Sequence, residues 1–260
     1  MGLFNNLFGS SSKGKEQEAK VRAQFRDAKY FQQEADRCNR FIEADKKNDI
    51  EYFKQHGRLT AFHYLSAASI RNQKIETLYS IGANIQDLLA IFQESTENFS
   101  SGWSEEYQDY PLLLQMVSFA LLFEVEKDEM NKIKDFINIA YGSTIEEIWK
   151  PDSLIFFLLN EKDKKRDGDK PYELLYDITQ LPKEKAEEAI KEYLDKWYEM
   201  HKDEPWYNTH LRDKGYSGYW AWEVGAVVKK MRLDDSSFKD HPFYPYDMVH
   251  WKKDNEKESH

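Results

Sequence analysis

The C-terminal third of the chain gathers the residue types that most often do chemistry. Ahead of the terminal His260 it holds four histidines, namely His201, His210, His241 and His250. The aspartates that accompany them are Asp203, Asp213, Asp240 and Asp247. Imidazole and carboxylate groups are good ligands for transition metals. The spacing of these residues matches no metal-binding pattern built on a helix, so the sequence predicts no metal site.

Glu223 is the most unusual carboxylate of the sequence. It stands between Trp222 and Val224 in a run that is otherwise apolar, and a buried carboxylate is costly unless it is paired or hydrogen-bonded. It is either a general acid or base with a raised pKa, or a structural acceptor for a tyrosine hydroxyl, an indole N–H or backbone N–H groups. We favour the structural role, because no second catalytic group stands at a defined spacing. Asp247 has the same two interpretations.

Enzyme signatures are absent from the sequence. It holds no GxSxG, P-loop, HExxH or GxGxxG motif. We therefore assign no catalytic residue and expect no cofactor. The enzyme class stays open as an alternative, in the form of a metal-dependent enzyme that uses Glu223 and the C-terminal histidines.

Residues 94–109 form an acidic segment. The chain has a net charge of −10, and residues 84–130 hold ten acids against one base. The acids of the segment are Glu94, Glu97, Glu105, Glu106 and Asp109, and its aromatic residues are Trp103 and Tyr107. Its Ser, Asn and Gly residues favour a loop, which is either a solvated connection or a recognition surface for a basic partner. The same charge disfavours direct binding of nucleic acid, because phosphates would be repelled.

Apolar residues recur at three- and four-residue spacing along most of the chain, which predicts helices. The expected helices include residues 15–47, a second one from about Asn48 that Gly57 could divide, residues 110–125 and residues 182–201. No stretch shows convincing β-alternation. We expect an all-α fold of about ten helices, a multi-helix antiparallel bundle with an extended C-terminal strap rich in aromatic residues and proline.

Four parts are expected along the chain. They are a flexible N-terminus at residues 1–14, an N-terminal helical region at 15–142, a C-terminal helical region at 143–251 and a disordered tail at 252–260.

Residues 216–251 are the stretch around which the rest is organised. Their first half, residues 216–231, is hydrophobic almost all round and predicts a buried helix, in which Gly218 and Gly225 let backbones approach closely. Short polar side chains at 234–236 are expected to end this helix, because they compete for backbone hydrogen bonds. Pro242 and Pro245 exclude a regular helix or a central strand in the second half, which is expected to be the extended strap.

The remaining features favour a protein of the cytoplasm. Cys38 is the single cysteine, so no disulfide forms within the chain, and a buried structural thiol is expected. No apolar stretch reaches the length of a membrane-spanning helix, and the start of the chain lacks the basic region of a signal peptide. We expect no membrane partner, and either a monomer or a homodimer.

One set of residues resembles the signature of a known family. The set is the run Gly218-Tyr219-Trp220 with Glu223, Asp234, Asp235 and the run Tyr244-Pro245-Tyr246-Asp247. In order and spacing it resembles the C-terminal signature of the PoNi family, which are bacterial immunity proteins that neutralise PoNe-type DNase toxins. The resemblance covers about the last fifth of the chain strongly, and the helical remainder by general pattern.

The resemblance implies an immunity protein that binds a cognate DNase toxin and blocks it without catalysis. The signature residues are expected to hold the fold first. The acidic segment 94–109 is the expected toxin-binding surface, an expectation that comes from the charge pattern and not from the resemblance. The third class of function that stays open is a helical adaptor protein with an unrelated partner.

Overall fold

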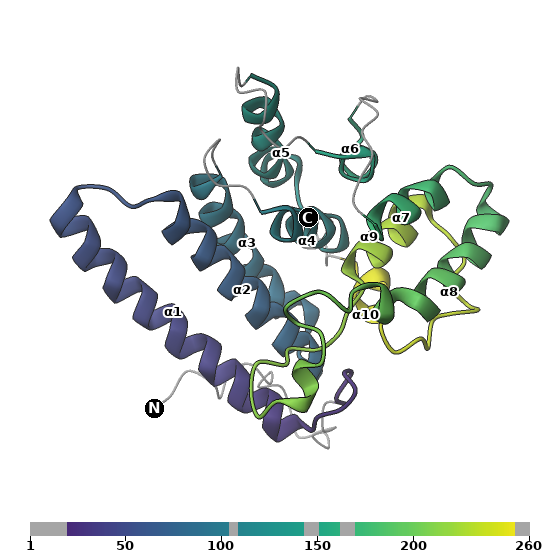
Figure 1. Ribbon diagram of the computed structural model, residues 1–260, viewed down its shortest axis with the longest axis horizontal. Coiled ribbons are helices and arrows are strands. Elements are labelled where there is room, and N and C mark those ends of the chain that lie inside the picture. The colour runs from purple at the N-terminus through teal and green to yellow at the C-terminus, as the bar shows by residue number, and fades with distance from the viewer. Residues whose placement is uncertain (1–19, 104–108, 143–150, 162–169, 253–260) are drawn as a thin grey trace, which may run out of the picture.

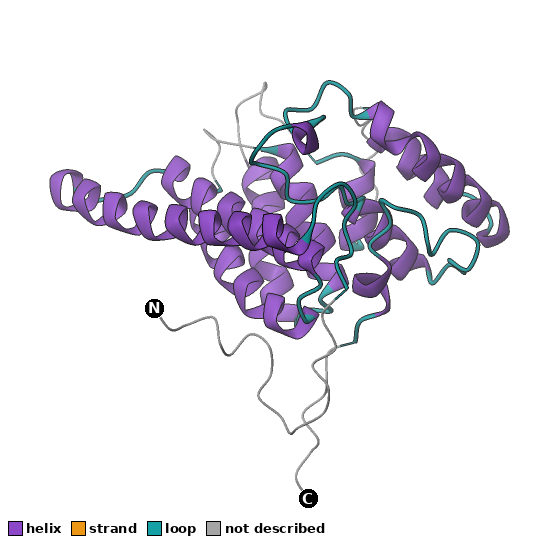
Figure 2. Cartoon of the chain, turned by 90° about the horizontal axis from the view of Figure 1, so that it is seen from below, coloured by secondary structure: helices purple, strands orange, loops and turns teal. Residues whose placement is uncertain are grey.

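The chain folds as an assembly of helices. The computed structural model describes residues 20–103, 109–142, 151–161 and 170–252. Within these ranges there are ten α-helices, one short 3-10 turn and no strand (Figures 1 and 2). The predicted all-α fold of about ten helices is therefore confirmed. None of the helices in this described part is long and apolar enough to cross a membrane.

The first three helices lie side by side (Figure 1). They are α1 (Ala28–His56), α2 (Ala61–Ile81) and α3 (Ile85–Gly102). Helix α2 packs against both of the others. Because it has neighbours on two sides, α2 buries polar residues as well as apolar ones, and its apolar side chains follow no single stripe.

Helix α1 begins and ends later than the sequence predicts. The N–H groups of Arg22 and Ala23 both donate to a carbonyl of α2. These hydrogen bonds hold the residues just before α1 in a non-helical conformation. Asp27 then caps α1 by accepting from the N–H of Tyr30 (2.9 Å). The helix continues through the boundary expected near residue 47, so that prediction is wrong, and it ends at Gly57 with φ 72°.

Residues 94–102 belong to α3, so the loop expected there is wrong over this part. Phe92, Ser95, Thr96 and Phe99 fall on one side of the helix at three- and four-residue spacing, and all four are fully buried. The hydroxyl groups that favoured a loop are used inside the fold instead. Ser95 donates to a backbone carbonyl of α2, and Thr96 donates to a carbonyl of α3 itself.

Seven further described helices complete the fold. They are α4 (Tyr110–Leu122), α5 (Lys127–Gly142), α6 (Ser153–Leu159), α7 (Tyr172–Thr179), α8 (Lys183–Met200), α9 (Trp222–Met231) and α10 (Tyr246–His250), with the 3-10 turn η1 at Thr209–Leu211. Helix α9 packs against both α4 and α10. The buried side chains of these helices and of α1–α3 form one continuous core.

The stretch 216–231 is only partly helical, so the prediction of one helix across it is wrong. Helix α9 starts at Trp222, and residues 216–221 pass alongside α2 in a non-helical conformation. Gly218 has φ 114°, and a Cβ built there would lie 2.2 Å from Oγ of Ser80. Gly218 thus allows the close approach that was expected of it, and the hydroxyl of Ser80, which donates to the carbonyl of Ser217, holds the segment against α2.

The C-terminal segment also differs from the expected extended strap. Turns between α9 and Pro245 lead into the short helix α10, where an extended conformation was expected. Pro245 is the residue directly before this helix, a position that does not need its missing N–H. A Cβ on Gly225 would lie 2.8 Å from Cγ of Pro245, so this segment packs closely on α9.

We expect Gly218→Ala to destabilise the fold more than Gly215→Ala. Both glycines have positive φ, 114° and 95°, which costs an alanine about 1–2 kcal/mol. Nothing lies within 4 Å of a Cβ at Gly215, whereas a Cβ at Gly218 meets Ser80 and Trp220, so overlap there adds about 1–3 kcal/mol. Urea unfolding of the two variants measures the difference. Equal losses would contradict the close approach of Gly218 to α2.

Candidate functional site

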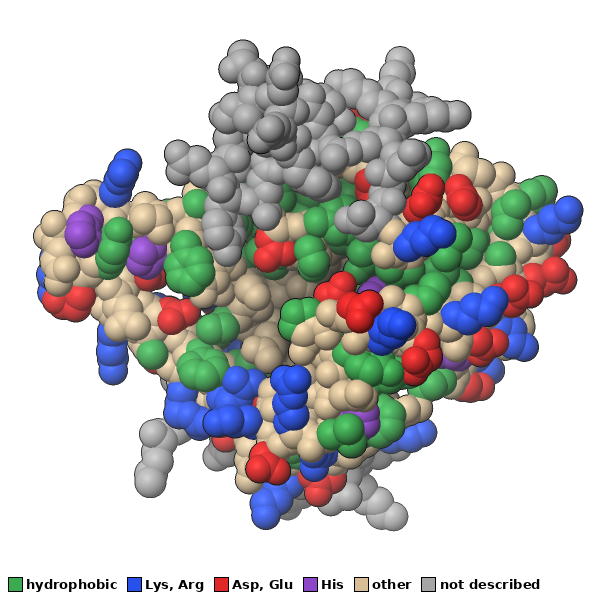
Figure 3. Space-filling view, in the orientation of Figure 1, with side chains coloured by type: hydrophobic (Ala, Val, Ile, Leu, Met, Phe, Trp, Pro, Cys, Tyr) green, Lys and Arg blue, Asp and Glu red, His purple; other side chains and the backbone are tan. Residues whose placement is uncertain are grey.

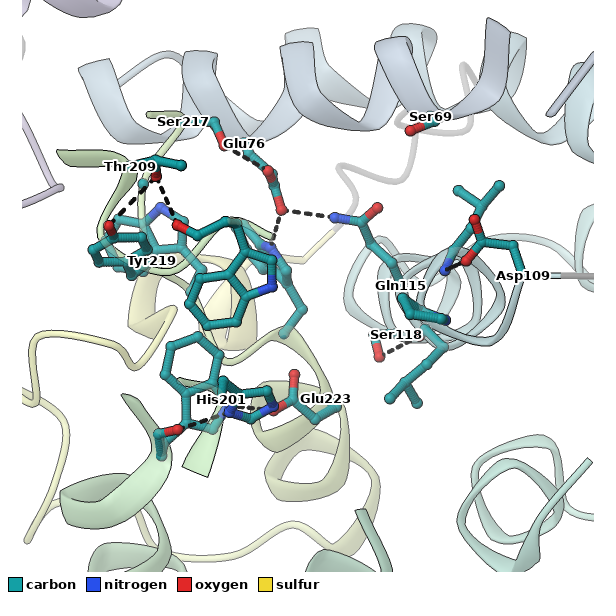
Figure 4. Close-up of a pocket in the computed structure, with 18 of the residues that line it drawn as sticks. Ser69, Glu76, Asp109, Gln115, Ser118, His201, Thr209, Ser217, Tyr219 and Glu223 are labelled. Carbon is teal, nitrogen blue, oxygen red and sulfur yellow. Dashed lines mark hydrogen bonds between the residues drawn. The ribbon is translucent and has the colours of Figure 1, made fainter. Parts of the chain in front are cut away.

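A cleft lies between the N-terminal helices and the C-terminal part of the chain (Figure 4). Its volume is about 280 Å³. Residues of α2 and α4 line one side, and residues of α7, the end of α8, the segment 206–220 and α9 line the other. The face seen in Figure 3 is hollowed near its centre, between these two parts. Carboxylates and aromatic rings converge on the cleft, which makes it the candidate site.

Glu76 of α2 receives three hydrogen bonds at this cleft. Its Oε1 accepts from Nε2 of Gln115 (2.7 Å) and from Nε1 of Trp222 (3.0 Å), and its Oε2 accepts from Oγ of Ser217 (2.8 Å). Burial raises the pKa of the Glu76 carboxyl, and the three hydrogen bonds oppose that rise because they favour the ionised form. The carboxylate therefore joins α2 to α4, to the segment before α9 and to α9 itself.

Sequence reasoning missed Glu76, and no local pattern marks it. The residue lies in the polar stretch Arg71-Asn72-Gln73-Lys74-Ile75-Glu76, where a carboxylate is ordinary. Its three donors are between 39 and 146 residues away along the chain. Only the packing of α2 in the middle of the fold brings them together.

Glu223 of α9 lies across the cleft and is 7% exposed. Nε1 of Trp197 donates to its Oε1 at 2.6 Å, which gives it the indole partner that was one of the expected possibilities. Burial raises the pKa of the Glu223 carboxyl, while the charge of His201 and the indole hydrogen bond act in the opposite direction. Nδ1 of His201 lies 2.7 Å from the carbonyl oxygen of Trp197. The carboxylate thus fastens α9 to the end of α8.

Aromatic rings form much of the wall of the cleft. Trp206 stacks on Trp197, with ring centroids 5.3 Å apart and planes at 19°. Tyr219 packs against Trp206 at 5.6 Å. Trp220 and Trp222 also line the cleft, and their indole N–H groups donate to α2. These rings are held in place by hydrogen bonds and by contacts with one another.

Asp109 stands at the rim of the cleft, at the start of α4. Its Oδ1 accepts from the N–H of Leu112 (3.0 Å), which caps the helix. Glu204, in the turns that follow α8, is near enough for the charge of Asp109 to act on it. Burial raises the pKa of Glu204, and the charges of Asp109 and Asp203 raise it further, so like charges gather at this end of the cleft.

The other residues of the predicted toxin-binding segment are dispersed. The side chains of Glu94 and Glu97 are 65% and 64% exposed on α3, and they pair with Arg71 and Lys132. Trp103 is buried against Phe99, at 5% exposure. The three residues Glu105, Glu106 and Tyr107 lie outside the described residues. Of the whole segment, the structure brings Asp109 to the cleft.

Most of the signature residues lie in the interior, and the buried ones are Tyr219, Trp220, Glu223, Asp235, Tyr244 and Pro245. Oδ2 of Asp235 accepts from the hydroxyl of Tyr244 (2.8 Å) and lies 2.7 Å from Nε2 of His250. The exposed members are Asp234, Tyr246 and Asp247. Asp247 pairs with Arg22 at 2.5 Å, so this exposed carboxylate ties the C-terminal segment to the start of the described chain.

The C-terminal histidines stand at separate places. His201 lies beside Glu223, His210 contacts Tyr219, His241 is 3.6 Å from Asp195, and His250 contacts Asp235. Among the described residues there is no group of three or more His, Cys, Asp or Glu side chains that could hold a metal ion. The residues that a metal-dependent enzyme would need are thus spread over several elements.

Two family models match the chain and together span most of it. Residues 15–135 match the N-terminal model of PoNe immunity proteins (PoNi), and residues 150–248 match the C-terminal model of the same proteins. No curated protein matches the chain.

A solved structure has a similar fold. The crystal structure of protein PA2201 from Pseudomonas aeruginosa matches with a TM-score of 0.57 at 16% sequence identity, over 88% of this chain and 90% of that chain. At this identity, the likeness shows that the two chains share a fold.

We expect Glu223→Gln to become more stable relative to the native protein as the pH rises from about 4 to 8. The pKa of the Glu223 carboxyl is raised in the folded protein, so the folded state keeps a proton that the unfolded state loses. The stability that this carboxyl contributes at low pH is therefore lost as the pH rises through the folded pKa. Glutamine keeps an acceptor for Trp197 and carries no charge. Thermal or urea unfolding across this pH range measures the difference.

Two further variants complete this test. Glu223→Ala leaves the Trp197 N–H without its partner and is expected to be about 1–3 kcal/mol less stable than Glu223→Gln at every pH. Glu188→Gln, on the exposed face of α8, is expected to change the free energy of unfolding by less than about 0.5 kcal/mol. If the difference in unfolding free energy between Glu223→Gln and the native protein did not change with pH, a raised pKa of the buried Glu223 carboxyl would be contradicted.

Proposed function

The chain belongs to the family of PoNe immunity proteins, and from this membership we propose that it neutralises a cognate PoNe toxin by binding it in a stoichiometric complex, without catalysis. The observation that carries the proposal is the match of the N-terminal and C-terminal family models over residues 15–135 and 150–248. The toxin we propose is a DNase. The complex forms in the cell that produces both proteins.

The charge of the chain supports this mode of action. A nuclease presents a basic surface to the phosphates of DNA, and this protein carries a net charge of −10. Opposite charge speeds the encounter of two proteins, whereas tightly packed contacts slow their separation. An acidic immunity protein can therefore reach the basic surface of the toxin before DNA does and stay there.

We propose that the acidic segment 94–109 contributes to the toxin-binding surface. Glu94 and Glu97 are exposed on α3, and Asp109 stands at the rim of the cleft. Acids of this segment therefore lie both on the surface of α3 and beside the cleft. Glu94 and Glu97 already have cationic partners within the fold, which lessens the charge they offer. We therefore assign the steering role to the segment as a whole, Glu105 and Glu106 included.

We expect co-expression with the toxin encoded next to this protein to keep cells alive, and the two proteins to purify together as one complex. Survival and co-purification both follow from stoichiometric binding. An inactive toxin variant is the control for expression in the absence of the immunity protein. Cell death without a complex, at verified expression of both proteins, would contradict the proposed function.

We expect the pair Glu105→Lys and Glu106→Lys to lower the association rate constant about tenfold at low salt, with little change in dissociation, because long-range attraction between charges acts mainly on encounter. The matched control is Glu184→Lys with Glu188→Lys, which makes the same change in net charge on the exposed face of α8. Stopped-flow mixing with the inactive toxin measures both.

Salt separates local steering from other effects. The slower association of the Glu105 and Glu106 variant should disappear at about 1 M salt, where the Debye length falls to about 3 Å. If the control pair slows association equally, the rate depends on the total charge of the protein, and the proposed steering role of segment 94–109 is contradicted.

A further inference from the structure

The cleft collects negative charge from three separate elements. Glu76 comes from α2, Asp109 precedes α4, and Glu223 comes from α9. Among the described residues that line the cleft there is no lysine or arginine. The three donors on Glu76 are an indole, an amide and a hydroxyl, all of them neutral. The fold thus gathers carboxylates here, and the one basic side chain among these described lining residues is the imidazole of His201, beside Glu223.

The aromatic wall suits a cation as well. Trp197, Trp206 and Tyr219 present ring faces and edges to one another and all line the cleft. Trp and Tyr rings attract a cation within about 6 Å of the ring centroid. A guanidinium group is planar, stacks on such rings and forms two parallel hydrogen bonds to a carboxylate. Carboxylates beside indole rings are therefore the surroundings that an arginine side chain prefers.

The size of the cleft decides what kind of molecule enters it. Its volume of about 280 Å³ lies just under the range of about 300–1,000 Å³ in which drug-sized ligands bind. One or two protein side chains fit such a space better than a cofactor does. A phosphate-bearing ligand is disfavoured, because the described lining holds three carboxyl groups and no lysine or arginine to pair with a phosphate. A positively charged side chain carried by a protein fits both the volume and the composition of the lining.

We propose that this cleft is the seat for an arginine side chain of the toxin, inserted between Glu76, Asp109 and Glu223 and covered by the Trp197–Trp206–Tyr219 wall. The inference rests on the proposed function and adds the place and the chemistry of the contact. The carboxylates at the rim, Asp109 with Glu204, draw the cation in. The rings and the deeper carboxylates then hold it where water is largely excluded.

Ser69 offers a way to test the cleft without touching its hydrogen bonds. It is an exposed residue of α2, two helical turns before Glu76 and therefore on the same face, and it lines the cleft (Figure 4). No hydrogen bond depends on its side chain among those described. Arginine and glutamate are both better helix formers than serine, so both variants should fold.

We expect Ser69→Arg to weaken binding of the inactive toxin at least tenfold, because it places a competing cation in the cleft. Ser69→Glu, which places the opposite charge at the same site on a shorter side chain, is expected to stay within threefold of the native protein. Asp109→Asn keeps the helix cap, since asparagine caps as well as aspartate, and is expected to weaken binding about threefold to tenfold. Isothermal titration calorimetry measures all three, with thermal unfolding as the check on folding.

Each outcome decides something different. If Ser69→Arg and Ser69→Glu weaken binding equally, the cleft is occupied but does not select a cation, and the proposal is overturned. If neither variant weakens binding, the toxin does not enter the cleft, and the proposal is overturned while the proposed function stands. If the native protein itself does not bind the toxin, the proposed function fails before the cleft is tested.

Discussion

The fold depends on how α2 receives the segment that precedes α9. Glu76 and Ser80, one helical turn apart on α2, accept hydrogen bonds from the side chains of Ser217, Trp220 and Trp222. Ser80 also donates to the backbone carbonyl of Ser217 (2.5 Å). This contact joins residues that are 137 positions apart in the chain, and it can form only because Gly218 leaves room beside Ser80. The two halves of the chain are therefore placed relative to each other by polar contacts on one helix.

Polar contacts of this kind place the two halves more selectively than apolar contacts alone would. Apolar surfaces can slide over one another with little change in buried area, whereas a carboxylate with three donors is satisfied in a single arrangement. The cost is desolvation, which is visible in the raised pKa of both Glu76 and Glu223. Both carboxylates lie in the walls of the same cleft. The residues that fix the relative position of the two halves are thus also the residues that give the cleft its charge.

The sequence predicts the helices better than it predicts their ends or their partners. Helical spacing was enough to expect about ten helices and no strands, because that pattern is local. It failed at 94–102, where Ser95 and Thr96 are residue types typical of loops. Both are buried, and their hydroxyl groups donate to carbonyl oxygens of α2 and α3. It failed at 216–221, where the apolar run resembles a helix and a contact with distant Ser80 prevents one. Glu223 stood out because its neighbours are apolar, whereas Glu76 was hidden among polar residues.

The position of the acids suggests why so much negative charge is tolerated in one protein. Burial raises the pKa of Glu204, and the charges of Asp109, at the rim of the cleft, and of Asp203 raise it further, so the free protein gains nothing from this repulsion. A cation bound in the cleft, as we propose for the toxin, would remove this repulsion, so the binding free energy would include its relief. Charge spread evenly over the surface would speed association with any basic protein. Charge concentrated in a narrow cleft with aromatic walls rewards a side chain of one size and shape, and in this way an acidic protein can distinguish one basic partner from the many others in the cell.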